Sequence, residues 1–283
     1  MTAPVLPIDT VFHPTDLSRA SHLAFVHALR IALAGEAELT IFHVLRDPHA
    51  QLDWSRFPGV RTTLEDWGLL PAGSGRSAIA ELGLRVEKIQ ARGHRPLDAL
   101  REYLRESPPQ LVAIATHGRD GVPRWLHRSV AEPVARLARA MTLFVRHGAR
   151  GFVDPKDGSV RLRRILVPIA RQPHAQPALR AAAALARAFA LEEVEFTLCH
   201  VGRPQEAPAL APPERAGWRW GTLDLPDGSL VPRLLDAAGA LDPDLIVMAT
   251  QGHRSARDAL FGNTTERLLR QAGCPVLALP ETT

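Results

Sequence analysis

The chain has 283 residues, 46% of them hydrophobic and 23% charged, a balance typical of a globular protein long enough for two domains. Its net charge of +4 comes from arginines spread beside glutamates without blocks of like charge, so the composition gives no support to nucleic-acid binding. No basic N-terminal region precedes an apolar stretch, and the most apolar segment, 178–191, is interrupted by two arginines and too short to cross a bilayer. We expect a cytoplasmic protein with neither membrane nor nucleic-acid partners.

In chain order, the first predicted elements form an alternating series of strands and helices. Residues 10–32 give a short strand, a proline-containing turn and an amphipathic helix, and 38–45 give a second strand that ends in His-Val. Residues 53–77 form an excursion punctuated by glycine and proline. A continuous apolar strand follows within 108–118, and the last strand of the series lies within 137–145.

The same series returns in the second part of the chain. Residues 164–186 align with the first strand and helix, 195–202 with the second strand, 242–252 with the continuous apolar strand, and 271–279 with the last strand. Such a repeat predicts two copies of one structural unit. The first copy is longer, and we place its extra residues in an insertion at about 48–78.

The alternation of strands and helices predicts parallel sheets with right-handed crossovers. We therefore expect two Rossmann-like α/β domains, each a doubly wound five-stranded parallel sheet, at residues 1–146 and 164–283. The polar, glycine-rich residues 147–163 are predicted to link them. The last strand of each copy is apolar and should lie at a sheet edge, so we expect the two copies to pair edge to edge as an intrachain pseudo-dimer.

In a doubly wound sheet the ligand site lies beyond the carboxyl ends of the strands, where the strand order reverses. This rule brings residues 14–16, at the end of the first strand, close to the loop at 115–129. In the second copy the matching loop holds Gly252 and Gly262, and Asn263 and Thr264 open the helix that follows. Glycines and hydroxyl groups at a helix start bind phosphate, but the same residues also form a helix cap that needs no ligand.

Signatures of catalysis are missing from the sequence. The phosphate-binding motif GxxxxGK[ST] is absent, and neither a carboxylate pair nor a Ser-His-Asp order recurs, so we predict no catalytic residues and no enzyme. His13, His43 and His117 should lie near the ends of neighbouring strands, which raises a zinc hypothesis. The second copy keeps only His200 of the three, which favours histidines bonded within the protein over a metal site.

Two stretches resemble the universal stress protein family, here in tandem. They are "VFHPTDLSRASHLAFVHALRIA" near the start and "DLIVMATQGHRSARDALFGNTTERLLRQAGCPVLAL" near the end. The resemblance covers nearly the whole chain twice, apart from the insertion and the linker. It implies a Rossmann-like, adenine nucleotide alpha hydrolase-like domain that dimerises through its last strand, and a family with one subgroup that binds ATP and one that does not.

The ATP-binding subgroup carries proline-x-aspartate after the first strand and G-x2-G-x9-G-[ST] after the fourth. The resemblance implies that the aspartate and the second strand hold the adenosine, while the glycines and the hydroxyl hold the phosphates. The first copy keeps the aspartate but has alanine and arginine at two glycine positions. Its nucleotide-binding candidates are Pro14, Thr15, Asp16, Leu39, Ala115, Gly118, Arg128, Ser129 and Val130.

The second copy keeps more of the phosphate end, yet Ala170 stands where the first copy has Asp16. Its candidates are Phe196, Ala249, Gly252, Gly262, Asn263 and Thr264. Each copy has therefore lost a different half of the site. The first copy has lost glycines of the phosphate end, where an added methyl group hinders the approach of phosphate to the backbone, and the second has lost the aspartate of the adenosine end. Arg128 either blocks the loop or replaces the lost amide contacts to phosphate.

The resulting hypothesis is a tandem, non-enzymatic stress-response or signalling protein whose ATP-type site is eroded in both copies. The alternatives are genuine binding of ATP or another adenine nucleotide through the first domain, and a small hydrolase or metal enzyme that uses the three histidines. No cofactor is required. The edge-to-edge pseudo-dimer leaves a homodimer of the whole chain as a further expectation. The aromatic residues Trp54, Phe57 and Trp67 make the insertion at 53–77 the candidate for a protein-partner surface or for a cover over the first domain.

Overall fold

The computed structural model describes residues 8–45, 57–93, 95–116, 131–250 and 263–281, together with positions 47, 49, 53 and 55. We call residues 8–146 the first half and 164–281 the second half. The first half contains the strands β1 (Thr10–Pro14), β2 (Glu38–Leu45), β3 (Arg85–Arg92), β4 (Leu111–Thr116) and β5 (Met141–Arg146). The second contains β6 (Arg164–Ile169), β7 (Val194–Val201), β8 (Trp218–Leu225), β9 (Leu245–Thr250) and β10 (Val276–Pro280).

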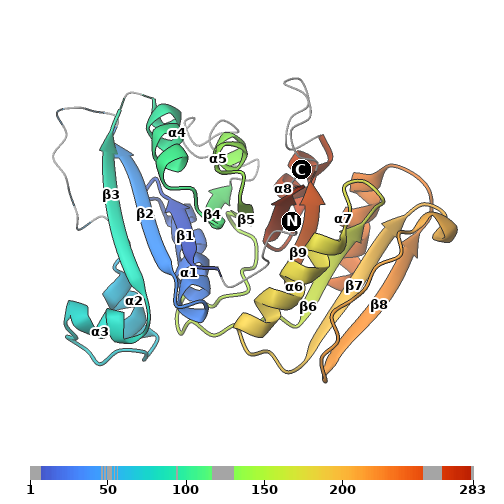
Figure 1. Cartoon of the computed structure of the whole chain (residues 1–283), viewed down its shortest axis with the longest axis horizontal. Helices are drawn as coiled ribbons and strands as arrows, with labels where there is room; N and C mark the ends of the chain where they lie inside the picture. Colours follow the sequence, from blue (N-terminus) through green and yellow to red (C-terminus); the bar gives the residue numbers. More distant parts are fainter. Residues whose placement is uncertain are drawn as a thin grey trace.

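All ten strands belong to one sheet with the order β3-β2-β1-β4-β5-β10-β9-β6-β7-β8 (Figure 1). Within each half the strands are parallel, and the order reverses beside β1 in the first half and beside β6 in the second. The predicted fold class, a doubly wound five-stranded parallel sheet in each half, is confirmed.

Helices cover both faces of the sheet. They are α1 (Arg19–Ala34), α2 (Val60–Asp66), α3 (Arg76–Glu81), α4 (Pro96–Glu106), α5 (Ala131–Ala138), α6 (Gln176–Ala188), α7 (Leu230–Leu241) and α8 (Asn263–Gln271). The helices α1, α2 and α6 contribute to one apolar cluster, and α4, α5, α7 and α8 contribute to the other. Alternate residues of one strand enter the two clusters, because successive side chains point to opposite faces: Leu111 and Ala113 enter the first, and Val112 and Ile114 the second.

The two halves meet where β5 and β10 pair antiparallel, with Leu143 opposite Leu277 and Phe144 opposite Val276. Copies that pair edge to edge through their last strands were predicted, and this pairing is confirmed. A side chain strengthens the seam, since Arg146 Nε donates to the carbonyl of Ala272 at 2.9 Å. The domain boundaries and a homodimer of the whole chain stay predictions.

The segment between the halves packs against the first half. Phe152 and Val153 are 1% exposed, and both backbone N–H groups donate to Nε2 of His27 in α1, at 3.1 and 3.3 Å. Gly151 is needed here because an added Cβ would lie 2.5 Å from Cε1 of the His27 ring. The segment that was predicted as a polar linker, residues 147–163, therefore packs against the first half through Phe152 and Val153.

The extra residues of the first half contain the crossover helices between β2 and β3. Trp67, which follows α2, is 7% exposed and donates from Nε1 to the carbonyl of Pro155 at 3.2 Å, and Phe57 is 4% exposed. Two of the three aromatic side chains in the predicted partner surface are thus buried within the chain, and Trp54 lies outside the described residues. Figure 1 shows α2 and α3 beside the start of β3, at the opposite end of the sheet from α4. These two helices therefore do not cover the carboxyl ends of the strands.

The second half makes the equivalent crossover, from β7 to β8, with an extended strap instead of helices. After a 3₁₀ turn at Pro204–Glu206, the strap is fixed by the side chain of Gln176, which bonds both backbone groups of Ala211 at 2.8 and 2.9 Å. Trp220 Nε1 donates to the carbonyl of Pro213 at 3.1 Å. The strap is thus held against α6 and β8 by side-chain bonds, on the crossover where the first half has helices.

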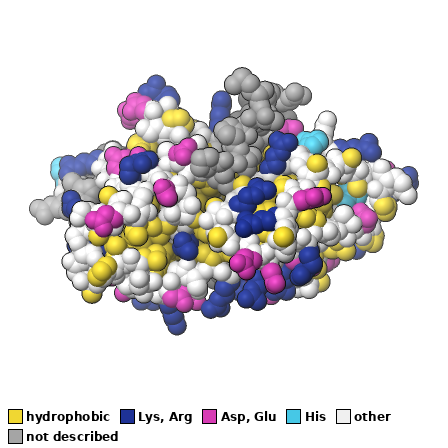
Figure 2. Space-filling view, turned by 60° about the horizontal axis from the view of Figure 1, so that its bottom comes forward, with side chains coloured by type: hydrophobic (Ala, Val, Ile, Leu, Met, Phe, Trp, Pro, Cys, Tyr) yellow, Lys and Arg dark blue, Asp and Glu magenta, His cyan; other side chains and the backbone are white. Residues whose placement is uncertain are grey.

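The surface carries charged side chains of both signs, as the composition suggests. On the face shown in Figure 2, Lys and Arg side chains alternate with Asp and Glu side chains and do not gather into one basic field. In the part of the chain that the structure describes, no helix is both long and apolar enough to cross a bilayer.

The contact between His27 and the linker predicts an acid-sensitive fold. Nδ1 of His27 donates to the carbonyl of Leu23 at 2.7 Å, so Nε2 accepts the two linker bonds only while the ring is neutral. Burial lowers the pKa of His27 from 6.5 to about 4. Between these values the unfolded chain binds more protons, so stability is full above pH 6.5 and falls toward pH 4. We expect His27→Gln, which keeps a neutral acceptor, to flatten this loss by up to about 1.4 kcal/mol per pH unit.

The measurement is the free energy of unfolding from urea titrations at several pH values between 4.5 and 7. His49 is exposed, and His49→Gln serves as the matched control that keeps the slope of the parent chain. An equal slope in the parent and His27→Gln contradicts the assignment.

Candidate functional site

A small pocket lies at the carboxyl ends of β1, β2 and β4, beside the first turns of α4. It has a volume of about 40 Å³, which is room for a few water molecules at roughly 10–15 Å³ each. On the described residues, the pocket is much smaller than a nucleotide-sized cavity of about 300 Å³ or more. The residues that line it are Pro14, Thr15, Asp16, Ser21, Phe42, His43, Val44, Pro96, Leu100, Ile114 and Ala115.

Four of the predicted site residues meet in this pocket: Pro14, Thr15, Asp16 and Ala115. They come from β1, the loop after it and β4, as expected where the strand order reverses. Gly118, Arg128, Ser129 and Val130 lie outside the described residues.

Hydrogen bonds fix the loop between β1 and α1, which carries Asp16. One carboxylate oxygen of Asp16 accepts from the backbone N–H of Ser18 at 3.0 Å and from its hydroxyl at 2.6 Å. The Thr15 hydroxyl oxygen accepts from the N–H of Leu17 at 3.0 Å and lies 2.9 Å from the hydroxyl of Ser21. Leu17 has a φ of 64°, a left-handed conformation that costs a non-glycine residue about 1–2 kcal/mol. These bonds hold the loop in this strained form.

Two histidines support the same loop from the sheet. His13 is fully buried, and its Nδ1 donates to the carbonyl of Ala113 at 2.9 Å, which leaves Nε2 to accept from the Ser21 hydroxyl at 3.5 Å. Burial lowers the pKa of His13 to about 4, so the ring is neutral. His43 donates from Nδ1 to the carbonyl of Thr15 at 2.8 Å.

These bonds bear on the metal hypothesis. His13 uses both ring nitrogens inside the protein, so it would have to break a bond before it could bind zinc. His117 lies outside the described residues. Among the residues whose positions the structure gives, no three His, Cys, Asp or Glu side chains form a group that could hold a metal ion.

The second strand contributes to the pocket at a different position from the one predicted. Leu39 is fully buried opposite Val11 and does not line the pocket. The strand instead reaches it through 42–44, since Phe42 is the residue paired with Pro14 at the end of β1. Pairing the strands from their carboxyl ends in the sequence would have indicated these residues.

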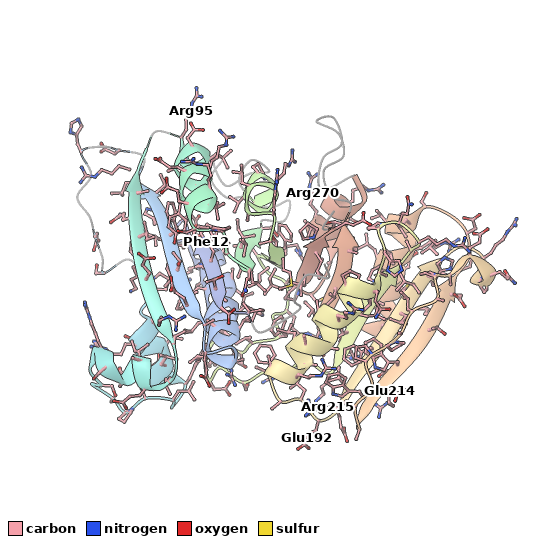
Figure 3. All side chains as sticks on the ribbon, in the orientation of Figure 1. Phe12, Arg95, Glu192, Glu214, Arg215 and Arg270 are labelled. Carbon is pink, nitrogen blue, oxygen red and sulfur yellow. The ribbon has the colours of Figure 1, made fainter. Side chains whose placement is uncertain are left out.

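The sequence interpretation also missed the contribution of α4 and of Ser21. Pro96 and Leu100 line the pocket from the first turns of α4, which starts at this end of the sheet because it follows β3. The proline at the start of the helix was a readable signal. Figure 3 shows Arg95 extending outward just before this helix. It also shows Phe12 within β1, and the ring of Phe12 stacks on that of Tyr103 in α4 with 5.4 Å between the ring centroids.

The candidates in the second half are not brought together in the same way. Phe196 is fully buried in β7 and stacks on Trp220 at 4.0 Å, so it belongs to the core. Ala249 is half-buried near the end of β9. Asn263 and Thr264 start α8, but their side chains, like all of Gly252 and Gly262, lie outside the described residues.

The loop after β6 makes a contact that the first half lacks. Ala170 follows β6 where Asp16 follows β1, and the next residue, Arg171, reaches across to the turn after β7. Its guanidinium donates to the carbonyls of Glu206 at 2.9 Å and Gln205 at 3.4 Å. The second half thus has a guanidinium held by two carbonyls beside the position at which the first half has a half-buried carboxylate.

Taken together, the strand order and the pocket at the carboxyl ends define a Rossmann-like α/β protein of the adenine nucleotide alpha hydrolase-like kind. Within that class the chain belongs to the universal stress protein family, whose sequence model matches residues 7–146 and 221–280. The second match begins in β8 and does not reach β6, α6 or β7.

Solved structures agree with this assignment at the level of the fold. A universal stress protein from Archaeoglobus fulgidus DSM 4304 has a TM-score of 0.61 at 18% identity, covering 96% of this chain and 98% of its own. A putative universal stress protein from Pseudomonas aeruginosa UCBPP-PA14 has a TM-score of 0.57 at 15% identity, covering 98% and 94%. A functionally unknown protein from P. aeruginosa PAO1 scores 0.59 at 15% identity with the same coverage. No curated protein matches the chain.

The capping of α1 predicts a measurable effect on stability. The side chain of Ser18 is the N-cap of α1 and also bonds Asp16, so Ser18→Ala should lower the free energy of unfolding by about 1 kcal/mol. Ser229 occupies the N-cap of α7 without a side-chain bond, and Ser229→Ala is the matched control with little expected change. Urea unfolding of both variants makes the comparison, and equal losses contradict the assigned cap.

Proposed function

We propose that this protein is a non-enzymatic stress-response or signalling protein whose first half binds an adenine nucleotide weakly, through the adenosine end of the pocket. The observation that carries this proposal is the half-buried Asp16 carboxylate, which lines a pocket with apolar walls at the carboxyl ends of the strands. A carboxylate in that position suits the hydroxyl groups of a ribose, which donate to it.

The phosphate end of this site supports weak rather than tight binding. Ala115 lines the pocket and is 8% exposed, so its methyl group occupies space where the family pattern has glycine. In the sequence Arg128 replaces a second glycine. Fewer backbone groups are then within reach of phosphate, which lowers the affinity for the triphosphate.

The second half is proposed not to bind nucleotide. Ala170 offers no acceptor for a ribose, and the guanidinium of Arg171 already spans the loops after β6 and β7. The protein would then signal through the nucleotide-bound and nucleotide-free states of its first half.

Tight, ATP-specific binding by the first half is the second candidate, and the intact Pro14-Thr15-Asp16 run favours it. It differs from the first in affinity, so one titration separates them. A metal enzyme is disfavoured, because both ring nitrogens of His13 are bonded within the protein and the described residues contain no group of three side chains that could hold a metal ion.

Calorimetric titration with ATP tests the proposal. We expect a dissociation constant above about 1 μM for the parent chain, and at least about tenfold weaker binding for Asp16→Ala, since a hydrogen bond to a charged group contributes about 1.5–3 kcal/mol. Asp224→Ala, at the end of β8 in the other half, is the control and should bind as the parent does. Sub-micromolar affinity of the parent rejects the weak-binding proposal in favour of the second candidate, and an unchanged Asp16→Ala rejects the site.

The eroded phosphate end predicts a gain of function. Ala115→Gly removes the methyl group from the pocket and should tighten ATP binding by about threefold to tenfold, while binding of adenosine stays the same. Ala249→Gly makes the equivalent change in the second half and should alter neither constant. The same calorimetry measures both ligands, and a gain for adenosine equal to that for ATP argues against a phosphate effect.

A further inference from the structure

The carbonyl of Thr15 is the point at which the sheet holds the Asp16 loop. Regular pairing of β1 with β2 ends at Pro14 opposite Phe42. Beyond it, the N–H of Thr15 donates to the carbonyl of Phe42 at 2.8 Å, and the carbonyl of Thr15 accepts from Nδ1 of His43 at 2.8 Å. A side chain thus secures the loop just after it leaves the sheet.

This bond acts on the peptide group that joins Thr15 to Asp16. The residues on either side of Asp16 are fixed, since Thr15 is bonded through its N–H, carbonyl and hydroxyl, and Leu17 is held in its left-handed conformation. The direction of the Asp16 side chain depends on the orientation of these two peptide groups and on the bonds that its carboxylate accepts from Ser18. Without the donor from His43, the carbonyl of Thr15 loses its hydrogen bond, and the peptide group that sets the direction of the carboxylate is held less firmly.

The second half provides an internal comparison. His200 corresponds to His43, because Pro168 pairs with Cys199 just as Pro14 pairs with Phe42. Nδ1 of His200 is buried and has no hydrogen-bond partner in the described part of the chain, and the nearest carboxylate oxygen, of Asp224, is 3.8 Å away. The strand β6 nevertheless pairs with β7 along its full length.

The histidine bond is therefore not needed to form this end of the sheet. It is present in the half that has an aspartate after its first strand, and it is absent in the half that has Ala170 there. The presence of the bond follows the aspartate rather than the strand pairing.

We propose that His43 is a positioning residue of the nucleotide site, which acts through the carbonyl of Thr15 to aim the Asp16 carboxylate at the ribose. The inference rests on the proposed function. It requires an N–H donor at the position of Nδ1. A variant that places its donor elsewhere should therefore bind the nucleotide more weakly.

Two amide variants of His43 separate position from polarity. The amide nitrogen of asparagine lies near the place of Nδ1, whereas that of glutamine extends toward the place of Nε2. In calorimetric titrations with ATP, His43→Asn should bind within about threefold of the parent, and His43→Gln should bind about tenfold more weakly, the size of one lost hydrogen bond. His200→Asn and His200→Gln are the matched controls in the second half and should both bind as the parent does.

A double-mutant cycle tests whether His43 acts through the aspartate. If it does, adding His43→Gln to Asp16→Asn should weaken ATP binding little beyond Asp16→Asn alone, because the carboxylate is already gone. Melting temperatures without ligand show whether each variant is folded at the temperature of titration. Should His43→Gln not fold, His43→Asn compared with His43→Leu answers the same question.

The outcomes distinguish this inference from the function on which it rests. A parent chain that binds neither ATP nor adenosine removes the nucleotide site itself. A parent chain that binds, together with a folded His43→Gln of equal affinity, overturns the positioning role and leaves the site intact. Equal losses from His43→Gln with and without Asp16 overturn it as well, since His43 then acts independently of the carboxylate.

Discussion

The antiparallel pairing of β5 with β10 is the interaction on which the rest of the structure depends. It buries Leu143 and Leu277 and removes two apolar strand edges, turning two α/β halves into one ten-stranded sheet. The strands left at the outer edges, β3 and β8, are mostly exposed or half-buried and carry charged side chains. Such edges resist further pairing, so the sheet ends where its apolar character ends.

The segment that joins the halves is an extension of the core. His27 accepts two backbone N–H groups from it, which satisfies buried donors that a loose linker would leave to water. Arg150, in the same segment, forms ion pairs with Asp242 and Asp244 of the second half at 3.0 and 3.1 Å. The linker therefore contacts both halves, and the relative position of the halves is set by packing as well as by the shared sheet. The neutral His27 ring is the condition for the two bonds from the linker to α1.

The repeat and the apolar runs were sufficient to predict two doubly wound parallel sheets and the pairing of their last strands, because burial on both faces leaves a plain pattern in the sequence. The details at the ends of strands were not predictable in the same way. Leu39 and Phe42 are both apolar residues of β2, and only the register with β1 shows that Phe42 reaches the pocket. The crossover of the second half was also hidden, since the strap is held by single contacts such as that of Gln176 with Ala211.

The two halves show which parts of this universal stress protein fold can change independently. Their cores are alike because β4 and β9 must fill the space between two helix layers, and a change there affects the whole sheet. The loops at the carboxyl ends bury little apolar surface, so loss of the aspartate at Ala170 and of the histidine bond at His200 leaves the strand pairing intact. The Asp16 loop contains Leu17 in a left-handed conformation, whereas the loop after β6, at the described residues 170–175, contains no such residue. Strain that is present after β1 and absent after β6, although both strands pair with their neighbours, points to a constraint on the Asp16 loop rather than on the sheet.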